Sequence, residues 1–253
     1  MNKILLFIPM YNCERQIVRV LGQLDEEIQK YLSEVIIINN RSTDNGEAVV
    51  EEFVEKSKFM IPVSLLRNKE NYGLGGSHKV AFDYALKNHF DYVIVLHGDD
   101  QGHINNLLPY LKNKEYEKYD CFLGARFKKG AQLDGYSAFR TLGNKVYNLL
   151  FSIVVNKKIY DLGSGLNMYA IGMLKDKFYL KYKDNLMFNY CMILGSSYYK
   201  HKMFFFPIRW SEDDQVSNVK MVNQAIVVLK LLGSYVINKR KFVEAEHRDN
   251  PLF

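Results

Sequence analysis

The sequence predicts an α/β protein, a mixed and mainly parallel sheet sandwiched by helices. Three observations support this class. Short runs of aliphatic residues recur along the chain, amphipathic segments separate them, and 48% of the 253 residues are hydrophobic. Unbroken aliphatic runs are typical of strands buried on both faces. Strands that alternate with helices predict a parallel sheet that is covered on both sides.

The elements follow in a regular order. Apolar runs predict strands at residues 4–8, 35–38, 63–66 and 93–96. Helical periodicity predicts helices at 14–31 and 47–56, and a third that leads from the glycine-rich segment 71–77 through residue 87. No internal repeat or low-complexity linker interrupts residues 1–220, which we expect to form one domain.

Residues 221–253 are expected to add a C-terminal amphipathic helix and a basic tail. One predicted helical face gathers apolar residues, and Lys239-Arg240-Lys241 follow. These apolar residues are Val222, Ala225, Ile226, Leu229, Leu232 and Val236. Three partners stay open for this face: bilayer headgroups, another subunit, or the protein's own domain.

Composition narrows the function classes. With 34 Lys and Arg against 28 Asp and Glu, the net charge of +6 suits phosphate-bearing ligands or an anionic membrane. No basic stripe or known module predicts nucleic-acid binding. Cys13, Cys121 and Cys191 lack CxxC spacing, which indicates a reducing compartment. The apolar run at residues 4–8 ends at Pro9, as in a first strand and unlike a signal peptide. We expect a cytoplasmic protein with peripheral contact to the inner face of the cell membrane.

The most informative segment is 93–101, an apolar run that ends in Asp99, Asp100 and Gln101. Ligands bind open α/β sheets just past the carboxyl ends of the strands. Mg²⁺ and Mn²⁺ prefer oxygen ligands and are commonly held by one or two carboxylates together with substrate phosphates. The segment therefore predicts a metal site that faces a diphosphate, and the plain alternative is a polar turn.

Further polar loops follow the other predicted strands. Residues 9–12 and 39–44 come after the first two strands, and a parallel sheet gathers such loops along one edge. The glycine-rich segment 71–77 adds backbone N–H groups at a helix N-terminus, with Lys79 one turn inside, which predicts an anion site.

These segments resemble the successive signatures of family 2 glycosyltransferases with the GT-A fold, which is Rossmann-like. The resemblance rests on residues 8–12, 38–44 and 71–76 and on the Asp99 cluster. Later segments resemble the dolichyl-phosphate mannosyltransferase-like branch; they are Leu123-Gly124-Ala125-Arg126-Phe127, Asp161-Leu162-Gly163-Ser164-Gly165 and Phe206-Pro207-Ile208-Arg209-Trp210. The match covers roughly residues 3–220 in order.

The resemblance implies an inverting transfer from a nucleotide sugar, with Mn²⁺ or Mg²⁺ neutralising the leaving diphosphate. It assigns donor contacts to Pro9, Tyr11, Asn12, Asn39, Asn40, Ser42, Gly73, Gly75, Lys79, Gly98 and Asp99. It assigns the metal to Asp99, Gln101 and His97, and catalytic roles to Asp99, Asp100, Arg126 and Arg140. The acceptor contacts it implies are Arg126, Arg140, Lys145 and Ser164.

The sequence departs from the family pattern at three places. Asn39 and Asn40 replace two acidic residues, and an amide that donates and accepts suits cytosine, which predicts a CDP-linked donor. His97 replaces the first aspartate of the metal motif, and imidazole suits Mn²⁺ better than Mg²⁺. Leu166-Asn167 and Glu212-Asp213-Asp214 stand where the branch has aromatic and basic residues, which puts the acceptor assignment in doubt.

The acceptor decides the mechanism. A polyprenyl phosphate is already an anionic nucleophile, whereas the hydroxyl of a lipid-linked saccharide or polysaccharide needs a general base. Asp134, Asp184, Asp213 and Asp214 are candidates for that base. The apolar segment 146–155 suits a core helix better than a membrane-interface helix because of its length.

We expect a bacterial enzyme of surface glycan synthesis, with a homo-oligomer as a further possibility. The main alternative is a non-catalytic nucleotide-sugar-binding scaffold on the same fold. A sugar-1-phosphate nucleotidyltransferase has a similar sheet, but it would want a long basic, glycine-rich loop after the first strand, and residues 9–12 do not provide one.

Overall fold

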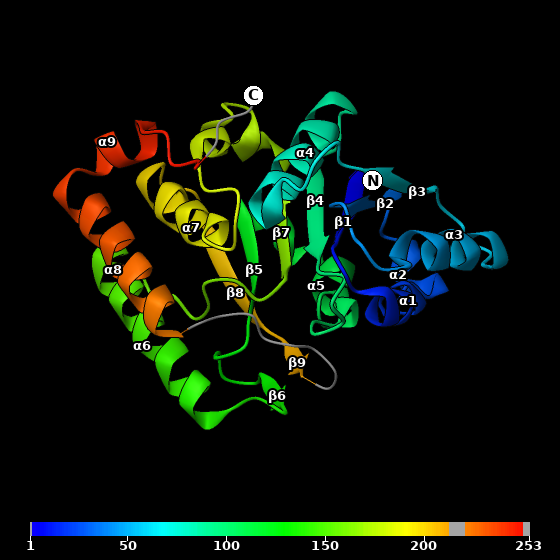
Figure 1. Ribbon diagram of the computed structural model, residues 1–253, viewed down its shortest axis with the longest axis horizontal. Helices are drawn as coiled ribbons and strands as arrows, with labels where there is room; N and C mark the ends of the chain where they lie inside the picture. The colour runs from blue at the N-terminus through cyan, green and yellow to red at the C-terminus, as the bar shows by residue number, and fades with distance from the viewer. Residues whose placement is uncertain (1, 213–220, 250–253) are drawn as a thin grey trace.

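The computed structural model describes residues 2–212 and 221–249. Its centre is a seven-stranded sheet in the order β3-β2-β1-β4-β7-β5-β8 (Figure 1). The strands are β1 Ile4–Met10, β2 Glu34–Asn39, β3 Val63–Arg67, β4 Tyr92–Leu96, β5 Cys121–Ala125, β7 Leu166–Ala170 and β8 Met203–Pro207. Neighbouring strands are parallel except at β7, which is antiparallel to β4 and β5. Two short parallel strands, β6 Gln132–Asp134 and β9 Arg209–Ser211, form a separate ribbon.

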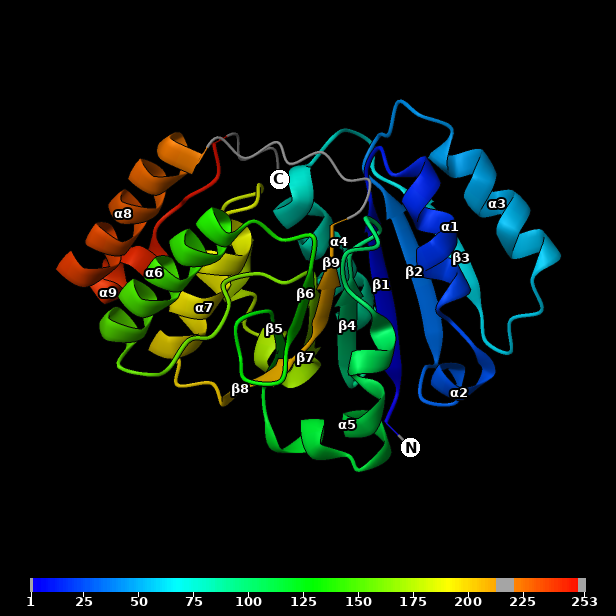
Figure 2. The ribbon, with the colours of Figure 1, turned by 90° about the horizontal axis from the view of Figure 1, so that it is seen from below.

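Helices cover both faces of the sheet (Figure 2). They are α1 Glu14–Gly22, α2 Glu26–Gln29, α3 Gly46–Lys56, α4 Gly73–Lys87, α5 Leu108–Lys112, α6 Ala138–Val155, α7 Phe188–Tyr198, α8 Met221–Ile237 and α9 Lys239–Glu244. Alternate residues of β1 point to opposite faces. Leu5 and Phe7 belong to one core cluster, to which α4, α6, α7, α8 and α9 also contribute. Leu6 and Ile8 belong to the other, to which α1, α2, α3 and α5 contribute.

The predicted mixed, mainly parallel sheet is confirmed, and two helix boundaries differ. The predicted helix 14–31 is two helices, because Asp25 ends the first by capping the second: its carboxylate accepts from the backbone N–H groups of Glu27 and Ile28. The glycine-rich segment is itself the first turn of α4, which begins at Gly73.

The predicted helix at residues 221–237 is present as α8, and the residues of its predicted apolar face are divided between the interior and the surface. Val228, Leu231, Leu232 and Tyr235 are buried, whereas Ile226, Leu229 and Val236 of the expected face are exposed. α8 carries apolar residues on both sides, so its periodicity does not define one inward face. α8 packs on α6, and α9 packs on α7.

α6 contains the apolar segment for which the sequence favoured a core position. Phe151 and Val155 are buried as expected, but Val146, Leu149 and Ile153 are exposed. The core prediction is therefore wrong for the outer side of this helix. Among the described helices, none is both long and apolar enough to cross a membrane.

Candidate functional site

The polar loops after β1, β2, β3 and β4 lie together at one edge of the sheet. Backbone hydrogen bonds join them: the Asn40 N–H donates to the Met10 carbonyl (2.8 Å) and the Gly98 N–H to the Pro9 carbonyl (3.1 Å). The Asn68 N–H donates in the same way to the Asn39 carbonyl (3.0 Å). The parallel register of the sheet thus brings together loops that are far apart in the sequence.

The loops after β1 and β2 hold each other through side chains. The Asn12 N–H donates to the Ser42 hydroxyl (3.0 Å), and the Thr43 N–H donates to Asn12 Oδ1 (2.8 Å). Asn39 is buried and accepts from the Ser42 N–H (2.8 Å). Asn12 has a positive φ of 48°, a strained conformation that asparagine tolerates well. Tyr11 is half exposed beside this junction.

Asn40 is a buried support for the loop after β3. Its Oδ1 accepts from Asn68 Nδ2 (2.9 Å) and from the Tyr72 N–H (2.8 Å), and its Nδ2 donates to Asn71 (2.7 Å). Asn68 and Asn71 could not be predicted as partners of Asn40, because nothing in the sequence pattern pairs three distant amides. Recognition of cytosine by Asn40 stays a prediction, and it requires a change in these contacts.

The N-terminus of α4 has a protein partner where the sequence suggested a free anion site. The carbonyl of Asp184 accepts from the N–H groups of Gly75 (2.7 Å) and Gly76 (3.2 Å). Lys79 is buried and donates to the Asp184 carboxylate (2.6 Å) and the Tyr182 carbonyl (2.5 Å). A Cβ on Gly75 would lie 2.5 Å from the Lys183 carbonyl oxygen, so the glycines permit this close approach. Donor contacts by Gly73, Gly75 and Lys79 stay predictions.

Asp99 lies at the start of the loop after β4 and is partly buried. Burial raises the pKa of its carboxyl to about 6; Asp100 adds to the rise, and the Gln101 N–H and Arg126 oppose it. A carboxylate whose charge is penalised by burial gains from a nearby cation. Asp99 is therefore suited to bind a metal ion.

Asp100 serves a different contact from the one the sequence suggested. Its backbone has a positive φ of 59°, and its carboxylate accepts from Nε of Arg19 in α1 (2.6 Å) and from Nε2 of Gln23, the residue after α1 (2.9 Å). These two contacts engage both carboxylate oxygens. The structure thus ties Asp100 to α1, and a catalytic role for it stays a prediction.

His97 is partly buried, and its imidazole is neutral. Burial, together with the charge of Arg126, lowers the pKa of its imidazole to about 4. Its Nε2 has no hydrogen-bond partner among the described residues. Gly165 permits this placement, because a Cβ there would lie 2.9 Å from the ring. A neutral imidazole with an unpartnered nitrogen is able to ligate a transition metal.

Within residues 2–212 and 221–249, no three His, Cys, Asp or Glu side chains converge as a metal site. A metal ion at this site would be held by the Asp99 carboxylate, the Gln101 amide oxygen and the His97 nitrogen. One carboxylate with an amide suits a cation that takes its remaining ligands from substrate phosphates.

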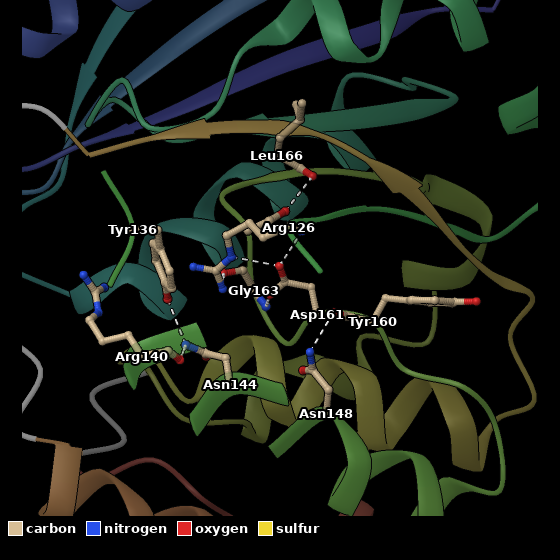
Figure 3. A network of polar contacts seen from close by, with 10 residues as sticks. Arg126, Tyr136, Arg140, Asn144, Asn148, Tyr160, Asp161, Gly163 and Leu166 are labelled. Carbon is tan, nitrogen blue, oxygen red and sulfur yellow. Dashed lines mark hydrogen bonds and ion pairs between the residues drawn. The ribbon is translucent and has the colours of Figure 1, made fainter. Parts of the chain in front are cut away.

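Arg126 forms a buried ion pair with Asp161 (Figure 3). Nε and one terminal nitrogen of Arg126 donate to the two carboxylate oxygens at 2.8 and 2.7 Å, and its backbone N–H donates to the same carboxylate at 2.8 Å. The guanidinium also donates to the Gly163 carbonyl and lies 4.8 Å from the Trp210 ring. Asp161 raises the pKa of the guanidinium, which stays charged. An acceptor contact by Arg126 stays a prediction.

Arg140 lies near Arg126, separated from it by the ring of Tyr136 (Figure 3). Arg140 pairs with Glu212, whose other oxygen accepts from Gln101 Nε2 at 3.4 Å. Glu212 therefore connects the predicted metal loop to α6. In the sequence, Glu212 is only the first residue of the acidic stretch 212–214. Its role could not be predicted, since only the fold brings it to Gln101.

The other two acceptor residues lie apart from this network. Lys145 is exposed on α6, whereas Ser164 is buried and donates to the Leu166 carbonyl (3.3 Å). Among the candidate bases, Asp184 pairs with Lys79, and Asp134 forms an exposed pair with Arg209 (3.0 Å). Asp213 and Asp214 lie outside the described residues.

A polar cavity of about 370 Å³ opens beside the metal loop. Its walls include Gln101, His103 and the two ion pairs Arg19–Asp100 and Arg209–Asp134. Its volume is at the lower end of the range of ligand pockets. Each arginine on its wall is matched by a carboxylate, so its lining is polar with little net charge.

Buried His78 gives a testable pH dependence. Burial, with His97 adding, lowers the pKa of its imidazole to about 3, while an unfolded histidine titrates near 6.5. Below pH 6.5 the unfolded chain binds a proton at this histidine that the folded chain does not bind. The free energy of unfolding therefore falls as the pH falls from 6.5 toward 3. We expect the unfolding free energy of wild type, relative to His78→Gln, to fall by about 1.4 kcal/mol per pH unit between pH 6 and 4. Urea titrations over this range test it, and a difference that does not change with pH would contradict it.

The chain matches a known family and known folds. Residues 6–178 match the model described as "Glycosyl transferase family 2". An uncharacterized protein of Methanocaldococcus jannaschii is 30% identical over 176 residues, which are 67% of this chain and 72% of that protein. The dolichol-phosphate mannosyltransferase of Pyrococcus furiosus is 24% identical over 143 residues, 56% of this chain and only 38% of that enzyme.

Among solved structures, glucosyl-3-phosphoglycerate synthase of Mycobacterium tuberculosis, in complex with Mn²⁺, UDP and phosphoglyceric acid, superimposes with a TM-score of 0.63. The match covers 96% of this chain and 79% of that one at 11% identity, which shows a shared fold. The family model covers more than half of the chain and agrees with the motifs at the sheet edge. The chain therefore belongs to family 2 of the glycosyltransferases, the enzymes that its sequence motifs predict.

Proposed function

We propose that this chain is an inverting, metal-dependent glycosyltransferase. It moves a sugar from a nucleotide sugar to a polyprenyl phosphate, or to a lipid-linked or polysaccharide acceptor, in surface glycan synthesis. The observation that carries the proposal is the partly buried Asp99 beside Gln101, at the sheet edge where the loops after β1 and β2 also lie.

The donor half of the site is built from these loops. The base and ribose of the nucleotide would contact Tyr11, Asn12 and Ser42. Hydrogen bonds already join Asn12 to Ser42 and to Thr43. Asp99 and Gln101 would hold the metal, with His97 as a third ligand. A bound cation would supply charge neutralisation at the leaving diphosphate. Supporting this, the related fold of glucosyl-3-phosphoglycerate synthase is described with Mn²⁺ and UDP.

The acceptor half is supported by arginines and by one relative. Arg126 and Arg140 lie on either side of Tyr136, and guanidinium groups suit phosphate because their donors form a planar fork. A phosphate acceptor needs no general base, which agrees with the pairing of Asp184 to Lys79 and of Asp134 to Arg209. The relative from Pyrococcus furiosus is named a dolichol-phosphate mannosyltransferase. Such an acceptor would place the protein at the inner face of the membrane.

Thermal-shift binding of UDP, GDP, CDP and dTDP, each with Mn²⁺, Mg²⁺ or EDTA, tests the donor half. We expect one nucleotide to raise the melting temperature only when metal is present. CDP would support the argument from Asn40, and UDP without CDP would contradict it. Stabilisation that ignores EDTA would contradict metal dependence, and the absence of any shift would contradict the donor site itself.

A further inference from the structure

α6 carries an exposed apolar stripe along its outer side. Every third or fourth residue contributes to it, and each member is between 48% and 71% exposed. The members are Phe139, Leu142, Val146, Leu149 and Ile153. The opposite side of the helix packs inward through Asn148, Phe151 and Val155. α6 is therefore apolar on a side that no described part of the chain covers.

α8 runs beside α6 and adds a second exposed apolar set. The two helices are neighbours in both views (Figures 1 and 2) and contact each other. The exposed members on α8 are Ile226, Val227, Leu229, Val236 and Ile237. We call these ten residues of the two helices the α6/α8 surface. Contiguous apolar patches of this kind on a protein surface mark contacts with other proteins or with membranes.

The charge around the α6/α8 surface separates these two partners. Residues 135–160 and 215–243 contain nine Lys and Arg and no Asp or Glu, which leaves 25 basic against 28 acidic residues in the rest of the chain. The exposed cations include Lys145 beside the α6 stripe, Lys230 on α8, and Lys239 and Arg240 at its end. These two segments thus carry positive charge beside the exposed apolar residues, although Arg140 pairs with Glu212 and Arg240 pairs with Glu244.

We propose that the α6/α8 surface docks on an anionic lipid bilayer. Apolar side chains would enter the headgroup boundary, and the flanking cations would bind acidic lipids. A second copy of the chain fits less well, because two such surfaces would bring like charges together. The ten residues of the surface include no carboxylate, and the flanking Glu244 already pairs with Arg240 of its own chain. The inference deepens the proposed function and rests on it in one respect, the lipid-linked acceptor.

The place of α6 in the fold relates this surface to the site. α6 begins at Ala138, and Arg140 in its first turn pairs with Glu212, which contacts Gln101. Phe139, the first member of the stripe, is the neighbour of Arg140 in the chain. Docking through α6 would therefore bring the arginine end of the site to the bilayer, where the phosphate of a lipid-linked acceptor lies.

Vesicle flotation of the full chain tests the proposal. Vesicles of phosphatidylcholine alone are compared with vesicles that also contain phosphatidylglycerol, at low and high salt. We expect wild type to bind the anionic vesicles, and to lose binding at high salt because screening weakens the charge contribution. The double variant Leu149→Gln/Leu229→Gln is expected to bind about tenfold or more weakly, since it removes apolar contacts from both helices.

Met60→Gln is the matched control, because Met60 is as exposed as Leu229 (both 53%) but lies outside the surface. Equal loss of binding in this control, or no binding by wild type, would overturn the proposal. A wild-type dimer that the double variant converts to a monomer would also overturn it, in favour of a second copy. Nucleotide binding measured without vesicles separates the docking proposal from the proposed donor site. If only docking is lost, the double variant still binds the nucleotide as wild type does. If wild type binds vesicles but no nucleotide, the docking proposal stands and the proposed function fails.

Discussion

Replacement of Asp161 by alanine is expected to destabilise the fold by about 3–5 kcal/mol, the largest stability effect that we predict for a single side chain. Asp161 is 2% exposed and accepts three hydrogen bonds from Arg126, two from the guanidinium and one from the backbone. Without the carboxylate, a buried guanidinium is left with no counter-charge. Urea-induced unfolding of the two proteins measures the difference.

Asp134→Ala serves as the control for Asp161→Ala. Asp134 also pairs with an arginine, Arg209, but both side chains are more than half exposed. Exposed pairs contribute at most about 1 kcal/mol. Removing both charges in Arg126→Met/Asp161→Leu is expected to recover part of the lost stability, because no buried charge remains unpaired. A loss in Asp161→Ala as small as that in Asp134→Ala would show that the buried pair does not stabilise the protein.

Asp99→Asn is expected to abolish metal-dependent donor binding and to lower transfer by on the order of 10²–10³-fold. The amide has nearly the same shape as the carboxylate but no negative charge for the cation. In wild type, burial of the charge raises the pKa of the Asp99 carboxyl to about 6. The uncharged amide does not carry this penalty, so the variant should fold at least as stably as wild type at neutral pH. Mn²⁺ titration in the presence of the nucleotide found by the binding panel measures the loss.

Two further carboxylates make the Asp99 result interpretable. Asp83→Asn, on the outer side of α4 where Asp83 pairs with Lys87 and Lys177, is the matched control and should leave metal binding unchanged. Asp100→Asn separates the sequence-based role from the observed contact with Arg19 and is expected to have a much smaller effect than Asp99→Asn. Equal losses in the variants of Asp99 and Asp100 would show that both carboxylates serve the metal.

Four of the seven strands of the sheet could be predicted from the sequence because their signal is local. The apolar runs at 4–8, 35–38, 63–66 and 93–96 are continuous and short, and each lies within an observed strand. The buried face of α8 could not be predicted, because apolar residues occur on both of its sides. The exposed stripe of α6 was misjudged for the same reason: an apolar residue in a helix has the same sequence pattern whether it faces the core or the solvent.

The site was predictable in its location but not in its contacts. The loops 9–12, 39–44 and 97–101 lie together because parallel strands end at one edge, which follows from the order of elements alone. The partners of Lys79, Arg126 and Asn40 did not follow. Each is bound by residues that are distant in sequence, such as Asp184, 105 positions from Lys79, and Asp161, 35 positions from Arg126.

The sequence by itself determined the fold class, the family and the edge of the sheet at which the predicted site lies, because periodicity and ordered motifs are properties of neighbouring residues. The tertiary structure decided which polar groups are available to a ligand. It places the Asp184 carbonyl on the glycine-rich turn, commits Asp100 to α1 and leaves the α6/α8 surface uncovered by the described residues. Burial and hydrogen bonding between distant segments depend on the packing of the whole chain, so no local pattern specifies them.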